Sequence, residues 1–211
     1  YNGTACPGTP NTPTWPGTST TLNYRAEAPS TPGITRSTSV ICNGSVVTFT
    51  GSDGGNGYLD GLEYQWNGTG GTWTNVGATT WNWTANSPGN TLYVRSRQFS
   101  TGCYAYSSPT SVYIDGYPAA GTASLDQAEY YAGQTATMTS SGGSNFYCWQ
   151  YQWNTTAGAW SGDWQFGNPA TWGTGGAQGQ TLYVRAVYQS TGGAGCRVYS
   201  SPVGIKVNYS T

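Results

Sequence analysis

The side chains that most often perform catalysis are scarce in this 211-residue chain. Histidine is absent, which removes the commonest general base and every Ser-His or Cys-His nucleophile arrangement. Asp60 and Glu63 could be weighed as a hydrolytic pair, but they lie in and beside a glycine-rich loop with no supporting motif. We therefore predict that both are solvated turn residues and that the chain is not an enzyme. The complete set of carboxylates is Glu27, Asp53, Asp60, Glu63, Asp115, Asp126, Glu129 and Asp163.

Metal and cofactor sites have little more support. Five cysteines without histidine and without C-x-x-C spacing do not make a zinc site. Asp53, Asn56 and Asp60 could surround a calcium ion through oxygen ligands, but their spacing differs from that of an EF-hand loop. The sequence therefore predicts no metal and no cofactor.

Composition excludes several classes of partner. Only 7% of the residues are charged and the net charge is −1, so there is no basic field for nucleic acid or an anionic membrane. No apolar run approaches the roughly 20 residues that span a bilayer. Aromatic residues make up 15% of the chain, which is typical of β structure with large buried rings. The chain begins at Tyr1 without methionine or a signal peptide, so we expect a processed, secreted product.

One stretch occurs twice and defines the organisation of the chain. TLYVRSRQFSTGCYAYSSP (residues 91–109) returns as TLYVRAVYQSTGGAGCRVYSSP (residues 181–202), with three residues added before the second cysteine. A period near 90 residues predicts two tandem small domains. We place them at residues 28–116 and 117–211, after an extended Thr/Pro-rich N-terminal arm of residues 1–27.

Within the repeats the apolar residues follow the period of a β-strand. Leu92 and Val94 alternate with Tyr93 and Arg95, and glycine-rich turns separate short apolar runs. The predicted fold is all-β, with two tandem immunoglobulin-like β-sandwich domains. Trp66 and Trp153 occupy the strand position where such domains bury a tryptophan. The strands predicted for the first domain are Ile34–Ser37, Ser45–Thr50, Leu62–Trp66, Thr72–Val76, Thr79–Thr84, Thr91–Arg97 and Ser111–Ile114.

The arm differs from the domains because it is too poor in apolar residues to bury a core of its own. Trp15, Leu22 and Tyr24 are isolated among its small polar residues, and Leu22 and Tyr24 alternate as in a strand. Two interpretations stay open: the arm packs on its own first domain, or it contacts a neighbouring subunit through these three residues. Cys6, also in the arm, is either an unpaired thiol or the site of an intermolecular bond.

A family resemblance is carried by three motifs. Cys42-Asn43-Gly44-Ser45-Val46-Val47-Thr48, the aromatic strand Tyr-Gln-Trp, and Thr-Gly-Cys before an alternating valine strand resemble the immunoglobulin-like and PKD-like repeats of secreted Bacteroidota surface proteins. The resemblance covers residues 28–209. It implies modules that serve as stalks, adhesins or fibre segments, and it says almost nothing about chemistry.

The same resemblance implies the disulfide pairing. Cys42 and Cys103 occupy the two positions that look paired in the resembling repeats. The second domain has Tyr131 in place of Cys42, so Cys148 is the replacement partner for Cys196. The predicted disulfides are therefore Cys42–Cys103 and Cys148–Cys196, each contributing about 3–4 kcal/mol.

Two kinds of glycan contact are also conceivable. Trp160, Trp164 and Trp172 are flanked by small polar residues and could form stacking platforms for sugar rings. Attached glycans would keep a chain with so few charges soluble. The N-x-S/T sequons lie at Asn2, Asn43, Asn67, Asn82, Asn154 and Asn208.

Together these patterns predict an extracellular structural subunit. We expect copies of the chain to assemble head to tail into a homopolymeric filament, with the arm donating a strand to the neighbouring subunit. The alternative is a cell-surface adhesin or carbohydrate-binding module. A third reading, an accessory region of a longer enzyme, needs a catalytic domain outside these residues.

Overall fold

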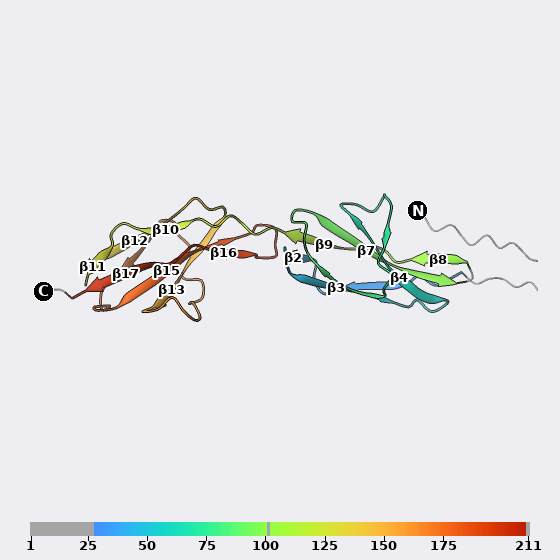
Figure 1. Ribbon diagram of the computed structural model, residues 1–211, viewed down its shortest axis with the longest axis horizontal. Helices are drawn as coiled ribbons and strands as arrows, with labels where there is room; N and C mark the ends of the chain where they lie inside the picture. The colour runs from blue at the N-terminus through green and yellow to red at the C-terminus, as the bar shows by residue number, and fades with distance from the viewer. Residues whose placement is uncertain (1–27, 101, 210–211) are drawn as a thin grey trace, which may run out of the picture. The chain divides into compact units, whose positions relative to one another are not determined.

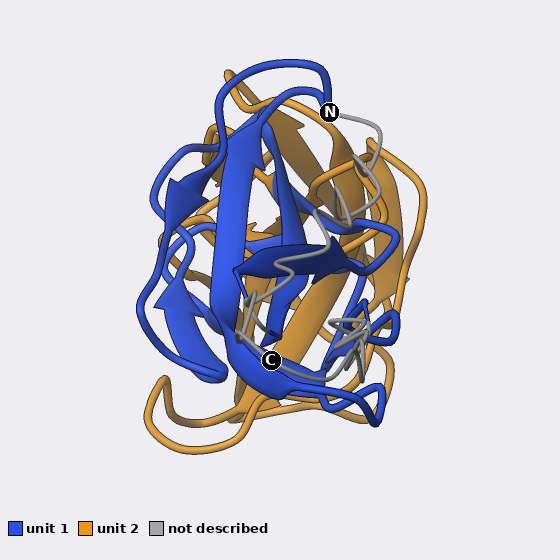
Figure 2. Cartoon of the chain, turned by 90° about the vertical axis from the view of Figure 1, so that its right-hand side faces the viewer, with its two compact units in different colours: residues 1–114 blue, residues 115–211 orange. Residues whose placement is uncertain are grey.

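The computed structural model describes residues 28–100 and 102–209, and all regular structure in them is β-strand (Figure 1). The chain divides into two compact units, unit 1 ending at Ile114 and unit 2 starting at Asp115 (Figure 2). The described residues contain no helix that is long and apolar enough to cross a membrane. The predicted all-β fold is confirmed. The predictions that lie outside the described residues are those for the arm, Asn2, Cys6, Trp15, Leu22 and Tyr24.

Unit 1 is a sandwich of two sheets. One sheet has the strand order β1-β3-β6, and the other has the order β2-β9-β7-β4-β5, with β8 paired to β7. Asp115, the last residue of β9, already belongs to unit 2. The strands are β1 (Gly33–Arg36), β2 (Val40–Cys42), β3 (Val46–Ser52), β4 (Tyr58–Trp66), β5 (Thr74–Asn75), β6 (Thr80–Thr84), β7 (Thr91–Ser100), β8 (Cys103–Tyr106) and β9 (Thr110–Asp115).

Unit 2 repeats this plan. Its sheets have the orders β10-β12-β14 and β11-β17-β15-β13, with β16 paired to β15. The strands are β10 (Thr122–Leu125), β11 (Glu129–Tyr131), β12 (Thr135–Ser141), β13 (Phe146–Trp153), β14 (Ala170–Gly173), β15 (Thr181–Gln189), β16 (Arg197–Tyr199) and β17 (Val203–Asn208).

The repeated stretch forms the central strands β7 and β15, and its alternation is confirmed. Leu92 and Val94 are fully buried between the sheets, whereas Tyr93 and Arg95 point to the other face of β7. Further along β7 the inward-facing residues are polar but still buried. Gln98, for example, accepts the N–H of Gly54 at 2.8 Å, which satisfies its amide oxygen. Inward-facing aliphatic side chains and paired polar groups together hold the centre of each sheet.

A second repeated signal, Tyr-Gln-Trp-Asn, marks the end of the neighbouring strand in each unit. Asn67 and Asn154 both have a φ of 55°, a left-handed conformation that asparagine tolerates better than most residues. Each asparagine amide oxygen accepts the backbone N–H of the first residue of the adjacent strand, Thr91 at 2.9 Å and Thr181 at 2.8 Å. The repeated asparagines therefore lock the start of β7 and β15.

The core tryptophan of unit 2 differs from the prediction. Trp153 is 38% exposed, so the prediction that it is buried is wrong, and Trp149 is the fully buried tryptophan of this unit. Its indole N–H donates to the carbonyl oxygen of Gly167 at 3.0 Å, which satisfies its one polar group. In unit 1, Trp66 is half-buried against the core, and the position that corresponds to Trp149 is held by Leu62. The two cores are therefore built from different large side chains.

Candidate functional site

The bonding state of the cysteines contradicts one predicted disulfide. Cys42, Cys103 and Cys196 are disulfide-bonded, whereas Cys148 is a buried free thiol. The predicted Cys148–Cys196 bond is therefore wrong. Cys148 is fully buried on β13, beside an irregularity in its pairing with β15, and lies on the strand face that carries Gln150, opposite the core residue Trp149.

The register of unit 1 also contradicts the predicted bond between Cys42 and Cys103. Cys103 is opposite Ser100, at the far end of β7. Cys42 ends β2, which pairs with β9, and β9 pairs with the segment Thr91–Val94 at the start of β7. Nine strand residues separate these two ends by about 30 Å. Disulfides join Cα atoms that are within roughly 7 Å of each other. The bond is therefore excluded, although both cysteines are oxidised.

The Cys148 thiol should be unreactive in the folded protein. Burial, followed by its hydrogen bond to Asp163, raises the pKa of Cys148 to about 12 from an ordinary value of 9.0, so the thiol is protonated at pH 8. Since the folded pKa is the higher one, the thiol's contribution to stability is complete below pH 9 and is lost as the pH rises toward 12. Iodoacetamide at pH 8 should label Cys148 only after denaturation, without any reductant. Rapid labelling of the native protein would contradict the assignment.

The candidate hydrolytic pair is held in ion pairs within unit 1. Asp60 and Glu63 lie in strand β4 rather than in a solvated turn, so that prediction is wrong. Glu63 is buried and accepts Nε and Nη2 of Arg95 at 2.9 and 2.8 Å and Nη1 of Arg97 at 2.8 Å. The carboxylate of Asp60 accepts Nε of Arg97 at 2.6 Å. Carboxylates bound in this way by guanidinium groups are poor general acids and bases.

Two of the oxygen ligands considered for calcium have other partners. Asp60 is bound to Arg97, and the carboxylate of Asp53 accepts the N–H of Gly55, two residues along its own loop. Among residues 28–100 and 102–209 there is no cluster of three or more metal-ligating His, Cys, Asp or Glu side chains.

The repeated Thr-Leu-Tyr-Val-Arg motif places an arginine between two aromatic rings. In unit 1 the guanidinium carbon of Arg95 lies 4.2 Å from the centre of the Trp73 ring and 4.0 Å from that of Tyr106. Cation–π contacts that are partly desolvated in this way stabilise a fold by about 0.5–2 kcal/mol each. The stack covers the face of the sheet that points away from the core.

Unit 2 builds the same stack from its own copies of these residues. The guanidinium carbon of Arg185 is 4.4 Å from the Trp160 ring and 3.9 Å from the Tyr199 ring. The acceptor is now an amide, because Oε1 of Gln150 accepts Nε and Nη2 of Arg185 at 3.1 and 2.8 Å. The structure therefore assigns Trp160, one of the predicted sugar platforms, to an intramolecular stack.

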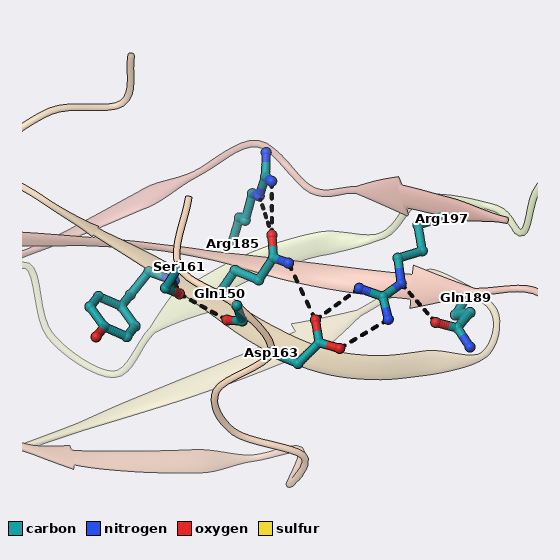
Figure 3. A network of polar contacts seen from close by, with 8 residues as sticks. Gln150, Ser161, Asp163, Arg185, Gln189 and Arg197 are labelled. Carbon is teal, nitrogen blue, oxygen red and sulfur yellow. Dashed lines mark hydrogen bonds and ion pairs between the residues drawn. The ribbon is translucent and has the colours of Figure 1, made fainter. Parts of the chain in front are cut away.

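A network continues from this stack across the face of the sheet (Figure 3). Gln150 donates to Asp163 at 3.3 Å, and Asp163 binds Arg197 through two parallel bonds of 2.8 and 2.9 Å. The hydrogen bond from Arg197 holds the pKa of Asp163 below its ordinary value. Gln189 accepts Nε of Arg197 at 2.7 Å. These polar groups satisfy one another, so the network is structural in character.

The aromatic groove is the remaining candidate site. It is an open pocket of about 130 Å³ in unit 2, between strand β13 and edge strand β14. Trp164 lies against Tyr151 with ring centres 5.1 Å apart, and Trp172 lies against Trp153 at 5.8 Å, both pairs at 68°. The lining residues of this groove are Tyr151, Trp153, Trp164, Trp172 and Leu182.

The corresponding region of unit 1 is packed differently. Trp83 pairs with Val47 as Trp172 pairs with the equivalent Ala136, so the two tryptophans occupy the same register position. Two residues earlier, unit 1 has Trp81 and unit 2 has Ala170. Trp81 packs against the rings of Phe49, Tyr64 and Trp83. In unit 2, Trp164 packs on Tyr151, the counterpart of Tyr64, at 5.1 Å, so it takes the place that Trp81 has in unit 1.

The three tryptophans predicted as sugar platforms therefore lie in two different places. Trp164 and Trp172 line the aromatic groove, whereas Trp160 is stacked on Arg185. The sequence had not indicated Trp153 as part of the groove, although its position in the repeated Tyr-Gln-Trp-Asn motif places it two residues from Tyr151 on the same strand face.

The described sequons differ in accessibility. Asn67, Asn82 and Asn154 are exposed, whereas Asn43 and Asn208 are half-buried. The amide nitrogen of Asn208 donates to Glu129 at 2.7 Å, and that of Asn67 donates to Asn90 at the same distance of 2.7 Å. Exposure favours Asn67, Asn82 and Asn154, and glycosylation at the six sequons stays a prediction.

The fold and the geometry define the class of protein. It has two tandem immunoglobulin-like β-sandwiches, each with an arginine stacked between aromatic rings on the outer face of a sheet and a row of aromatic rings, the aromatic seam, at one edge. No family model matches the chain, and no curated protein matches it. One similar solved structure is titled "Structures of Clostridium thermocellum CbhA fibronectin(III)-like modules". The identity is 12%, the TM-score is 0.47, and the match covers 84% of this chain and 95% of that one.

Proposed function

We propose that the chain is a non-enzymatic structural subunit of an extracellular filament. Subunits assemble head to tail, and the arm of residues 1–27 adds as a strand to a sheet edge of the neighbouring subunit. A contact between two different surfaces of the same chain propagates into an open fibre unless it closes into a ring.

The observation that carries this proposal is the presence of open sheet edges in both units. Within the described residues β6 pairs only with β3, and β14 pairs only with β12. Each strand therefore presents an outer edge to which another strand can hydrogen-bond. In the arm, Leu22 and Tyr24 alternate in the way an added strand requires.

An extracellular setting is supported by the oxidised cysteines. Cys42, Cys103 and Cys196 are disulfide-bonded, and disulfides persist mainly in oxidising compartments. The candidate acid–base residues of unit 1, Asp60 and Glu63, are neutralised by arginines, which supports a structural role over a catalytic one.

A carbohydrate-binding adhesin is the second candidate, and the aromatic groove is the observation that favours it. Trp164 and Trp172 offer ring faces for sugar stacking. The lining supplies only a tyrosine hydroxyl and indole N–H groups for the many hydroxyls of a pyranose. A glycan array on which binding weakens in Trp164→Ala and Trp172→Ala, but not in Asn82→Ala, would support this candidate.

Deleting residues 1–27 tests the filament proposal. The shortened chain should remain folded and monomeric, because it keeps the described core residues of both units, which lie between Ile34 and Val207. Negative-stain microscopy and sedimentation should show filaments for the full chain and none for the deletion. Filaments that form unchanged without the arm would rule out arm-mediated assembly.

A further inference from the structure

We propose that the aromatic groove of unit 2 binds a polyproline II segment, and that this segment is residues 7–16 of the arm of a neighbouring copy. The inference rests on the proposed filament function for the identity of the donor chain. The groove itself, with its four aromatic rings and Leu182, lies wholly within unit 2.

The spacing of prolines in the arm is the first argument. Pro7, Pro10, Pro13 and Pro16 recur at every third residue, in the run PGTPNTPTWP. A polyproline II helix has three residues per turn and a rise of about 3.1 Å per residue. All four prolines therefore fall on one face, about 9 Å apart. Such a segment is pre-ordered by its own prolines, so docking it costs little conformational entropy.

The chemistry of the groove is the second argument. Proline-rich segments dock in grooves lined by aromatic side chains, where prolyl rings sit between aromatic rings. Two ring pairs inclined at 68° line this groove, Tyr151 with Trp164 and Trp153 with Trp172. Their hydroxyl and indole N–H groups are donors, and the carbonyl oxygens of a polyproline II segment have no internal partners.

Charge supports the same occupant. Residues 1–20 of the chain contain no Asp, Glu, Lys or Arg, and neither do the residues that line the groove. Docking therefore removes no charged group from water. A pyranose, in contrast, would bring several hydroxyls to a lining with few hydrogen-bonding groups.

The two units differ in the origin of one of the aromatic rings. In unit 1 it is Trp81 on edge strand β6, which packs on Tyr64 at 5.3 Å. In unit 2, Ala170 stands at that position, and Trp164 from the segment between β13 and β14 packs on the equivalent Tyr151 at 5.1 Å. The lining of the groove in unit 2 is therefore supplied partly by a connecting segment.

The test is binding of a fluorescein-labelled peptide of residues 7–16, measured by fluorescence anisotropy. The receptor is the full chain carrying Pro10→Ala and Pro13→Ala, so that its own arm does not compete. The peptide should bind saturably, and Trp172→Ala in the receptor should weaken binding at least tenfold. The matched control is Trp83→Ala, the same register position in unit 1, which should change the affinity less than twofold. Should Trp172→Ala fail to fold, the exposed Trp153 provides the second variant, Trp153→Ala, with the same expected loss.

Several outcomes would overturn the proposal. The first is the absence of peptide binding. The second is binding to the Trp172→Ala and Trp153→Ala receptors that is as tight as binding to the receptor with both tryptophans. The others are equally tight binding of a peptide that carries Pro10→Ala and Pro13→Ala, and displacement of the peptide by neutral oligosaccharides alone. The filament proposal is judged separately. Filaments that persist in a groove variant that has lost peptide binding would refute this docking site and leave arm-dependent assembly standing. Peptide binding by a chain that forms no filaments would support the docking site and refute the filament proposal.

Discussion

Replacing Glu63 by alanine should lower the free energy of unfolding of unit 1 by about 3 kcal/mol, in line with the loss of one partner of a buried ion pair. Glu63 is 5% exposed and accepts hydrogen bonds from Arg95 and Arg97. Its removal leaves Arg95 held between Trp73 and Tyr106 without a counter-charge. Urea denaturation followed by tryptophan fluorescence measures the loss.

Unit 2 supplies the control for this prediction. Gln150 occupies the place of Glu63 there and accepts Arg185 through its amide oxygen. Glu63→Gln should therefore keep the hydrogen bonds to Arg95 and cost clearly less than Glu63→Ala. Equal losses for the two variants, or a loss below about 0.5 kcal/mol for alanine, would show that the ion pair is of the weak, surface kind.

Replacing Trp149 by alanine should have the largest effect on unit 2, a loss of about 3–5 kcal/mol, because the cavity cannot be refilled by small movements. Trp149 is fully buried, packs against the ring of Phe146 at 5.6 Å, and bonds Gly167. Differential scanning calorimetry should show the transition of unit 2 at a lower temperature while that of unit 1 keeps its position.

The matched control is Trp153→Ala, on the same strand and the same face. Trp153 is 38% exposed and lines the aromatic groove, so its removal should cost much less than that of Trp149. A Trp149→Ala protein that unfolds like the wild type would contradict the assignment of Trp149 as the central core residue.

The sequence predicted the parts of the fold that depend on local pattern. The alternation around Leu92 and Val94 predicted β7, and the repeat predicted its counterpart β15, because a one-sided strand must bury every second side chain. The short strands β2 and β8 were missed. Each has three or four residues and is defined by the strand it pairs with, so no local periodicity announces it.

The disulfides were mispredicted because pairing depends on distance in the fold and not on spacing in the sequence. Cys42 and Cys103 lie near opposite ends of β7, and Cys148 is a buried free thiol beside Asp163. The position of Asp60 and Glu63 was missed for a related reason. The glycine-rich loop before them suggested a turn, yet β4 begins at Tyr58 and continues through Gly61 with a register shift.

The aromatic groove was predicted in part. Trp164 and Trp172 were recognised by their small polar neighbours, but Trp160 has the same neighbours and stacks on Arg185. The discriminating signal was the repeat itself. An arginine retained in both copies of Thr-Leu-Tyr-Val-Arg indicates a shared partner, and Trp73 and Trp160 are those partners.

Electron cryomicroscopy of filaments grown from the full chain tests the central claim most directly. At a resolution that traces the backbone, the part of the arm around Leu22 and Tyr24 should follow a sheet edge of the next subunit, with backbone hydrogen bonds to an edge strand such as β6 or β14. A map in which the arm folds back onto its own unit, with neighbouring subunits joined only through residues 28–211, would contradict the account.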